Sequence, residues 1–178
     1  MASPWKKVAD VAIGGLTEVG FVPRSSLLMV ASHQGRGLLD LITGDRLARD
    51  RQETGTWFDA SRPAVLGIGP LDGQWINVAG LAGGHLPVTT ADGWRAWLAD
   101  RGVTLSGPAG ELVAVNQPEE IRAFGFSPDG AIFVVASSPS IMIFRRNTPG
   151  HRLRPCHSRP ICRMRGRRPG QIGIFSVR

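Results

Sequence analysis

Apolar residues in this chain occur in short runs separated by Gly, Pro, Asp and Ser, a pattern typical of β-strands joined by tight turns. The clearest example is the stretch 124–137, which reads strand, turn, strand, and the stretch 19–32 is an earlier copy of it. The identical pairs, at a constant offset, are Gly20/Gly125, Phe21/Phe126, Pro23/Pro128, Val30/Val135, Ala31/Ala136 and Ser32/Ser137. We therefore predict a repeated β-hairpin around which the rest of the chain is organised.

Three units follow from this pattern, at about 16–51, 61–102 and 103–150. Their shared register rests on strand-ending residues and on large apolar residues seven positions later, Ser32/Leu39, Thr90/Trp97 and Ser137/Phe144. This register places the turn of the second unit at 83–84 and spaces the units by 58 and 47 residues. A competing register sets 72–73 opposite 129–130. Periods of this size, with about four short strands each, are typical of propeller blades.

The stretch 126–137 looks like the central hairpin of such a blade. Leu39-Asp40 followed by Thr43-Gly44 is similar to a Trp-Asp blade end, with Leu in place of Trp, whereas 97–98 and 144–145 keep only the aromatic residue. On these residues the segment 16–150 resembles the blades of WD40-type and related β-propellers. The resemblance implies an all-β fold, a partial β-propeller of about three four-stranded antiparallel units.

Three blades are fewer than the four to eight of closed propellers. Each blade needs neighbours to cover its faces, so three would leave open edges and exposed apolar faces. Three outcomes remain open. The chain could pair with a second copy to close a ring of about six blades, it could be a fragment of a longer propeller, or its strands could close as a smaller barrel or sandwich.

The net charge of +7 is carried by the C-terminal tail. Residues 147–178 contain 8 of the 21 Lys and Arg and none of the 14 Asp and Glu, which leaves the first 146 residues near −1. We divide the chain into a lead-in at 1–15, the repeat region at 16–150 and a basic Arg/Pro-rich tail at 151–178. For the tail we weigh disorder, a shifted reading frame and a native basic appendage.

Neither a secretory leader nor a membrane span is expected. The stretch 8–16 is interrupted by Asp10 and two glycines, and no apolar run approaches the roughly 20 residues that cross a bilayer. Both cysteines lie in the tail, so a secreted disulfide scaffold is not indicated. We expect a cytoplasmic protein without membrane contact.

Groups suited to catalysis or cofactor binding are sparse. The tail residues His151, Cys156, His157 and Cys162 have the chemistry of zinc ligands, but their spacing lacks the close pairs of structural zinc sites. The aspartates 72, 92 and 129 each precede a glycine, which favours a role in turns over acid/base chemistry. We predict no catalytic residue, no metal site and no cofactor.

Two sets of residues are candidates for binding. Trp57, Trp75 and Trp94 could form a partner surface, because Trp is enriched at binding hot spots, although core packing is the default for most of them. Trp94 and Trp97 are three apart, so on a strand one should be buried and the other exposed. Arg163, Arg165, Arg167 and Arg168 could give the tail a weak, salt-sensitive contact with nucleic acid or another polyanion.

The function that these observations favour is a non-catalytic protein–protein interaction scaffold of WD40-like type. Its partner would be another protein or a second copy of the chain. The alternatives are a ligand-binding or enzymatic propeller whose site is completed by oligomerisation, and a nucleic-acid-associated protein that acts through its basic tail.

Overall fold

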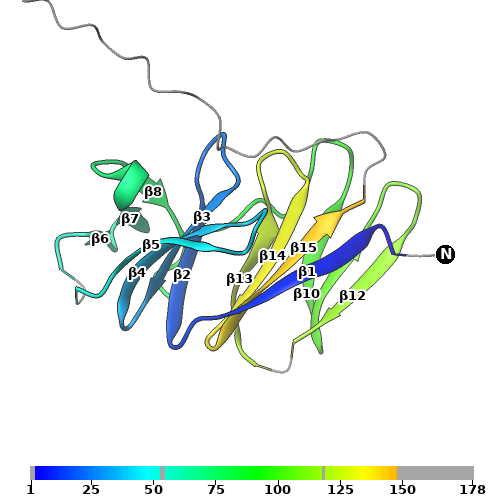
Figure 1. Cartoon of the computed structure of the whole chain (residues 1–178). Coiled ribbons are helices and arrows are strands. Elements are labelled where there is room, and N and C mark those ends of the chain that lie inside the picture. Colours follow the sequence, from blue (N-terminus) through cyan, green and yellow to red (C-terminus); the bar gives the residue numbers. More distant parts are fainter. Residues whose placement is uncertain (1–2, 53–54, 118, 148–178) are drawn as a thin grey trace, which may run out of the picture.

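The computed structural model describes residues 3–52, 55–117 and 119–147, and within them the chain is all-β, with four antiparallel sheets (Figure 1). We number the sheets I to IV by their order in space. Sheet I contains β6 (Phe58–Asp59), β7 (Ala64–Leu66) and β8 (Trp75–Asn77). Sheet II contains β2 (Leu16–Phe21), β3 (Leu27–Ser32), β4 (Gly35–Asp40), β5 (Arg46–Asp50) and β9 (Ala79–Gly80).

Sheet III combines the two ends of the described chain. It contains β13 (Ile121–Phe126), β14 (Ile132–Ser137), β15 (Ser140–Arg146) and, on the outer side of β15, β1 (Trp5–Ala12). Sheet IV contains β10 (Arg95–Ala99), β11 (Gly102–Ser106) and β12 (Leu112–Asn116). The single short 3₁₀-helix of the described residues is η1 (Gly69–Leu71), so no helix there is long enough to cross a membrane.

The predicted repeated hairpin is confirmed. Phe21 pairs with Leu28 in sheet II, and Phe126 pairs with Phe133 at the same position in sheet III. The first strand of each hairpin is irregular at the same place, between residues 16 and 18 and between 121 and 123. The third strands match as well, because the hydroxyls of Ser32 and Ser137 each donate to the carbonyl oxygen three residues later.

Four sheets are present where three units were expected, because the second and third units are both divided. The first strands of the second unit form sheet I, and its last strand, β10, joins β11 and β12 of the third unit in sheet IV. The remaining strands of the third unit belong to sheet III. The turn equivalent to 127–130 is 90–93 and not 83–84: Thr90 donates to Asp92 and accepts from the Trp94 amide, as Ser127 does with Asp129 and Ile132. The pair 83–84 instead closes a turn after β9.

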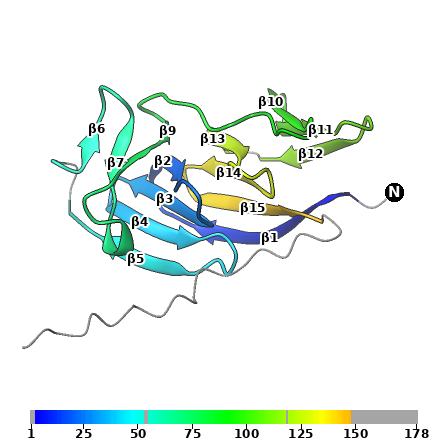
Figure 2. The same ribbon diagram turned by 90° about the horizontal axis from the view of Figure 1, so that it is seen from above.

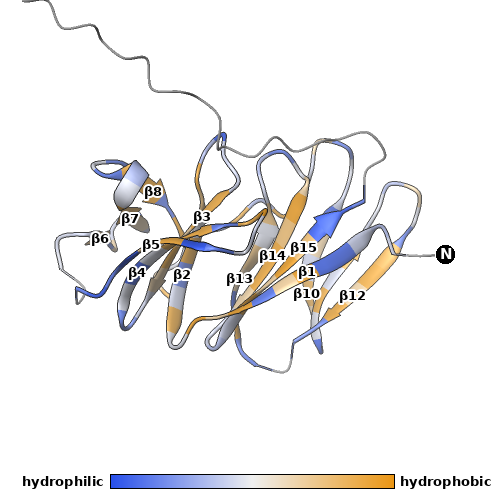
Figure 3. Ribbon diagram, in the orientation of Figure 1, coloured by the Kyte–Doolittle hydropathy of each residue, from blue (hydrophilic) through white to orange (hydrophobic). Residues whose placement is uncertain are grey.

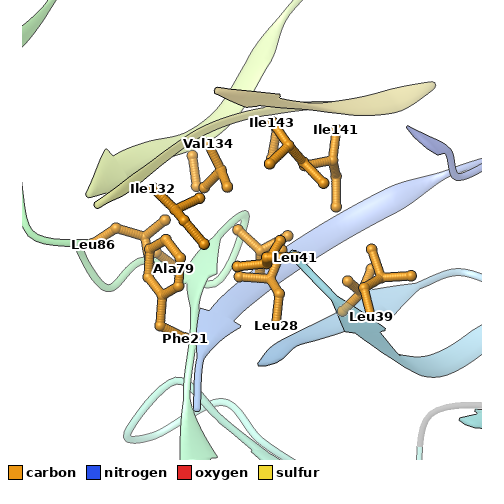
Figure 4. Packing of buried hydrophobic residues seen from close by; sticks show 14 of the residues in the cluster. Phe21, Leu28, Leu39, Leu41, Ala79, Leu86, Ile132, Val134, Ile141 and Ile143 are labelled. Carbon is orange, nitrogen blue, oxygen red and sulfur yellow. The ribbon is translucent and has the colours of Figure 1, made fainter. Parts of the chain in front are cut away.

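The sheets stack face to face in the order I, II, III, IV, which leaves I and IV at opposite ends (Figures 1 and 2). Three clusters of buried side chains join neighbours: one lies between I and II, one between II and III, and one between III and IV. The cluster between II and III includes Leu28 and Leu39 on one side and Val134 and Ile143 on the other (Figure 4). No cluster in the described residues joins sheet I to sheet IV.

The apolar run of β14 follows from this stacking. Val134 and Ala136 pack toward sheet II, and Phe133 and Val135 pack toward sheet IV, so both faces of the strand are buried and all six residues are apolar or small (Figure 3). Strand β1 at the outer edge is more exposed. Trp5 is buried in the cluster between sheets III and IV, and after a register shift between Lys7 and Ala9 the side chains of Ala9 and Val11 pack against the cluster between sheets II and III. The charged Lys6 and Lys7 are exposed.

A crossing segment, residues 78–90, connects the two halves along the inner edges of sheets II and III (Figure 2). Strand β9 pairs with β2 through Ala79 and Val19, and the Phe126 amide donates to the Pro87 carbonyl oxygen. Leu86 is buried between the sheets. Thr90 was expected to end a strand, but the residues before it form only one isolated bridge, Thr89 to Arg95, because this segment follows two sheets in turn instead of joining one.

Candidate interaction surfaces

The two end sheets each have one face that packs on a neighbouring sheet and one face that no other sheet of the described residues covers. Large apolar side chains are exposed on both ends. Trp75 of sheet I is 39% exposed, and Trp97 and Leu112 of sheet IV are 41% and 72% exposed. Most soluble domains do not leave such side chains together on a surface without a partner, so these faces are the first candidates for interaction.

The uncovered face of sheet IV is set by strand alternation. Trp97 pairs with Thr104, which pairs with Ala114, and Leu112 occupies the same face one row further along. The alternate residues, Leu105 and Val115 among them, are buried against sheet III. Because side chains on one strand alternate between faces, Trp97 and Leu112 share the side that points away from the rest of the molecule.

On sheet I the exposed ring is Trp75, whose strand neighbour is Leu66. The Arg62 guanidinium lies over the ring at 5.0 Å and also binds the Asp59 carboxylate at 2.8 Å. A hydrogen bond from Ser61, together with this Arg62 charge, lowers the pKa of Asp59. The Trp75 face is therefore an aromatic ring beside a cation that already has its counter-charge, a combination suited to a protein interface.

Trp57 and Trp94, the other two predicted partner residues, lie in the core. Trp57 is 3% exposed between sheets I and II, and Trp94 is 4% exposed between sheets III and IV. Their burial agrees with core packing as the default, and it leaves Trp75 as the exposed member of the set. The expectation that one of Trp94 and Trp97 is buried and the other exposed is confirmed.

A polar and aromatic contact fixes sheet IV on sheet III. Arg146 of β15 forms an ion pair with Asp92 in the turn before β10, and its guanidinium lies 5.9 Å from the Trp5 ring. Trp5 in turn meets Trp94 edge to face, with centroids 5.5 Å apart. The hydrogen bond from Arg146, followed by that from Thr90, lowers the pKa of Asp92 to about 2.

The aspartates serve turns, as predicted. Asp129 accepts hydrogen bonds from Ser127 and the Ala131 amide, and Asp92 accepts from Thr90. Within the described residues no three His, Cys, Asp or Glu side chains gather in a way that could hold a metal ion. The tail candidates, His151, Cys156, His157 and Cys162 as well as Arg163, Arg165, Arg167 and Arg168, lie outside the described residues.

Sequence reasoning did not select Leu112 or the arginines of β5. Leu112 begins the run Leu-Val-Ala-Val, which reads as a buried strand, and only the position of sheet IV at the end of the stack exposes it. Arg46 and Arg49 fall at the polar end of the first predicted unit, and no local pattern in the sequence indicates that they line a cavity.

The chain was compared with models of known protein families and with curated protein sequences, and neither comparison found a match.

Proposed function

We propose that this protein is a non-catalytic protein–protein interaction module, a WD40-like array of stacked sheets whose two uncovered end faces bind protein. The supporting observation is the pair of end faces with exposed Trp75 and Trp97. Within the described residues, the faces of sheets II and III and the inner faces of sheets I and IV are covered by a neighbouring sheet through an apolar cluster. The end faces lack this cover while presenting the same kind of side chain.

The partner that fits both ends at once is a second copy of the chain. In a two-fold pair, sheet I of one copy would stack on sheet IV of the other, and the reverse contact would form at the opposite end. Such a pair would contain eight stacked sheets, within the range of four to eight blades that closed propellers use. Three units per chain would have given a ring of about six blades for two copies. Because each copy has four sheets, the ring that we propose has eight.

Light scattering of the full chain in reducing buffer, over a range of concentrations, tests this assembly. We expect about twice the chain mass of 19.1 kDa. The variants Trp75→Ser and Trp97→Ser should each shift the pair toward monomer, because each removes an aromatic ring from one of the two interfaces. The matched control is Leu47→Ser, which changes a side chain of similar exposure, 42%, on β5 of sheet II.

Two results would overturn the proposal. A monomer at every concentration would mean that the end faces are not self-binding. A mass that grows with concentration without a plateau would indicate open-ended stacking of sheet I on sheet IV, and not the closed pair.

A further inference from the structure

A cavity of about 260 Å³ lies between the link that joins β1 to β2 and the outer strands β4 and β5 of sheet II. Its apolar lining includes Ile13, Val30 and Leu39, of which Val30 and Leu39 are almost fully buried. Arg46 and Arg49 of β5 line it as well. Arg36 of β4 is a third arginine in the lining. The cavity thus combines apolar side chains with three arginines, and it lies on sheet II, away from both end faces.

The cavity borders on Gly37, which has no side chain to occupy the space. Gly37 pairs with Val30 on one side and with Arg49 on the other, so it occupies the centre of this part of the sheet. A Cβ at Gly37 would meet one atom within 4 Å, the Ala48 carbonyl oxygen at 3.6 Å, which is an ordinary contact. The backbone there does not require glycine, and a larger side chain would enter free space.

Two of the three arginines that line the cavity, Arg46 and Arg49, have no carboxylate partner among the described residues. Arg49 donates to the Gln34 side chain at 3.2 Å, and Arg46 donates to the Ala12 carbonyl oxygen. The neighbouring acid, Asp50, is bound by Arg36 at 3.0 Å. None of the described residues that line the cavity is acidic.

A second, open hollow extends the positive surface. It is lined by His33, Gln34, Arg49 and Arg51, and it shares Gln34 and Arg49 with the cavity. Arg51 is exposed and adds a further cation on this side. An anion approaching the cavity would therefore meet positive charge before it reached the apolar interior.

We propose that this cavity binds a small organic anion. Its carboxylate or phosphate head would be held by Arg46 and Arg49, and its apolar body would pack on Ile13 and fill the space beside Gly37. Guanidinium groups bind both kinds of head group through paired hydrogen bonds. The volume lies slightly below the usual range of about 300–1,000 Å³ for ligand pockets, which favours a ligand with a short body.

Calorimetric titration of the full chain at neutral pH and low ionic strength tests this site. Hexanoate and hexyl phosphate share one apolar body and differ in the head group, so they distinguish a carboxylate site from a phosphate site. Hexanamide has the same body without charge. We expect saturable binding of at least one anion, and binding of hexanamide at least tenfold weaker.

Two variants remove the two halves of the site. Arg46→Gln combined with Arg49→Gln removes the charge, and Gly37→Leu fills the space while both arginines remain. Each should weaken binding of the anion tenfold or more. The matched control combines Arg24→Gln with Arg101→Gln, which makes the same change in net charge at two exposed turns and should bind like the wild type. If the leucine variant does not fold, Gly37→Ala takes its place, with a smaller loss expected.

Binding that is unchanged in Gly37→Leu, or unchanged in the double arginine variant of β5, would overturn the proposal. Equal loss in the control pair would do the same, because it would assign the binding to general positive charge. The result is independent of the self-assembly experiment, since neither end face is changed.

Discussion

Trp5 should contribute more to stability than any other residue of β1, although it lies close to the N-terminus. It is 4% exposed and its ring lies 5.5 Å from Trp94, 5.5 Å from Phe126 and 6.1 Å from Phe133. Removal of a buried aromatic side chain costs about 3–5 kcal/mol. Each aromatic pair contributes about 0.5–1.5 kcal/mol beyond the contribution of the apolar surface that it buries. We therefore expect Trp5→Ala to lower the free energy of unfolding by about 3–5 kcal/mol, a large part of the roughly 5–15 kcal/mol of a typical domain.

Urea unfolding followed by circular dichroism, at one fixed protein concentration, measures this loss. The control is Val8→Ala on the same strand, which is 42% exposed and should change the free energy of unfolding by less than about 0.5 kcal/mol. A loss below about 1 kcal/mol for Trp5→Ala would refute the reasoning, because it would mean that β1 is not part of the core between sheets III and IV.

Two further predictions concern single contacts. Asp92→Asn should lower stability by about 0.5–1 kcal/mol at pH 7, a value reduced for solvent screening because Asp92 is half exposed. The folded pKa of Asp92, about 2, lies below the usual value of 3.8 for an aspartate, so its contribution is present above pH 4 and is lost as the pH falls toward 2. A wild-type-to-variant difference that stays constant from pH 7 to pH 2.5 would contradict this. Gly125→Ala places a Cβ 2.4 Å from the Leu86 Cβ and should cost about 1–3 kcal/mol in a thermal melt, because the crossing segment must shift. Gly14→Ala, with open space around it, is the control, and equal effects of the two would argue against this close approach.

The repeated hairpin could be predicted because its information is local. Short apolar runs on either side of a Ser-Pro-Asp-Gly turn specify strand, turn and strand without reference to the rest of the chain. The match extends to the same irregularity in both first strands. The turn of the second unit was misplaced because Gly83-Gly84 and Asp92-Gly93 are both strong turn signals, and only the hydrogen bonds of Thr90 distinguish them.

The candidate site depended more on tertiary position. Trp57 and Trp75 are the same residue type in similar local sequence, yet one lies between two sheets and the other on an end face. The role of β1 was also beyond local reasoning, because its partner β15 is more than a hundred residues away. What the sequence did predict correctly was the alternation itself, as with Trp94 and Trp97, since alternation is a property of the strand and not of its neighbours.

The pairing of β1 with β15 has a consequence for synthesis on the ribosome. Trp5 pairs with Arg146, so the outer strand of sheet III waits for 141 further residues to be made. At 5–20 residues per second this takes roughly 7–28 s. The four consecutive strands of sheet II are complete by residue 50. Until the strands of sheet III have also been made, the side of sheet II that carries Leu28 and Leu39 has no sheet III to cover it. The nascent chain thus carries an apolar surface for seconds, the condition under which chaperone binding and aggregation compete with folding.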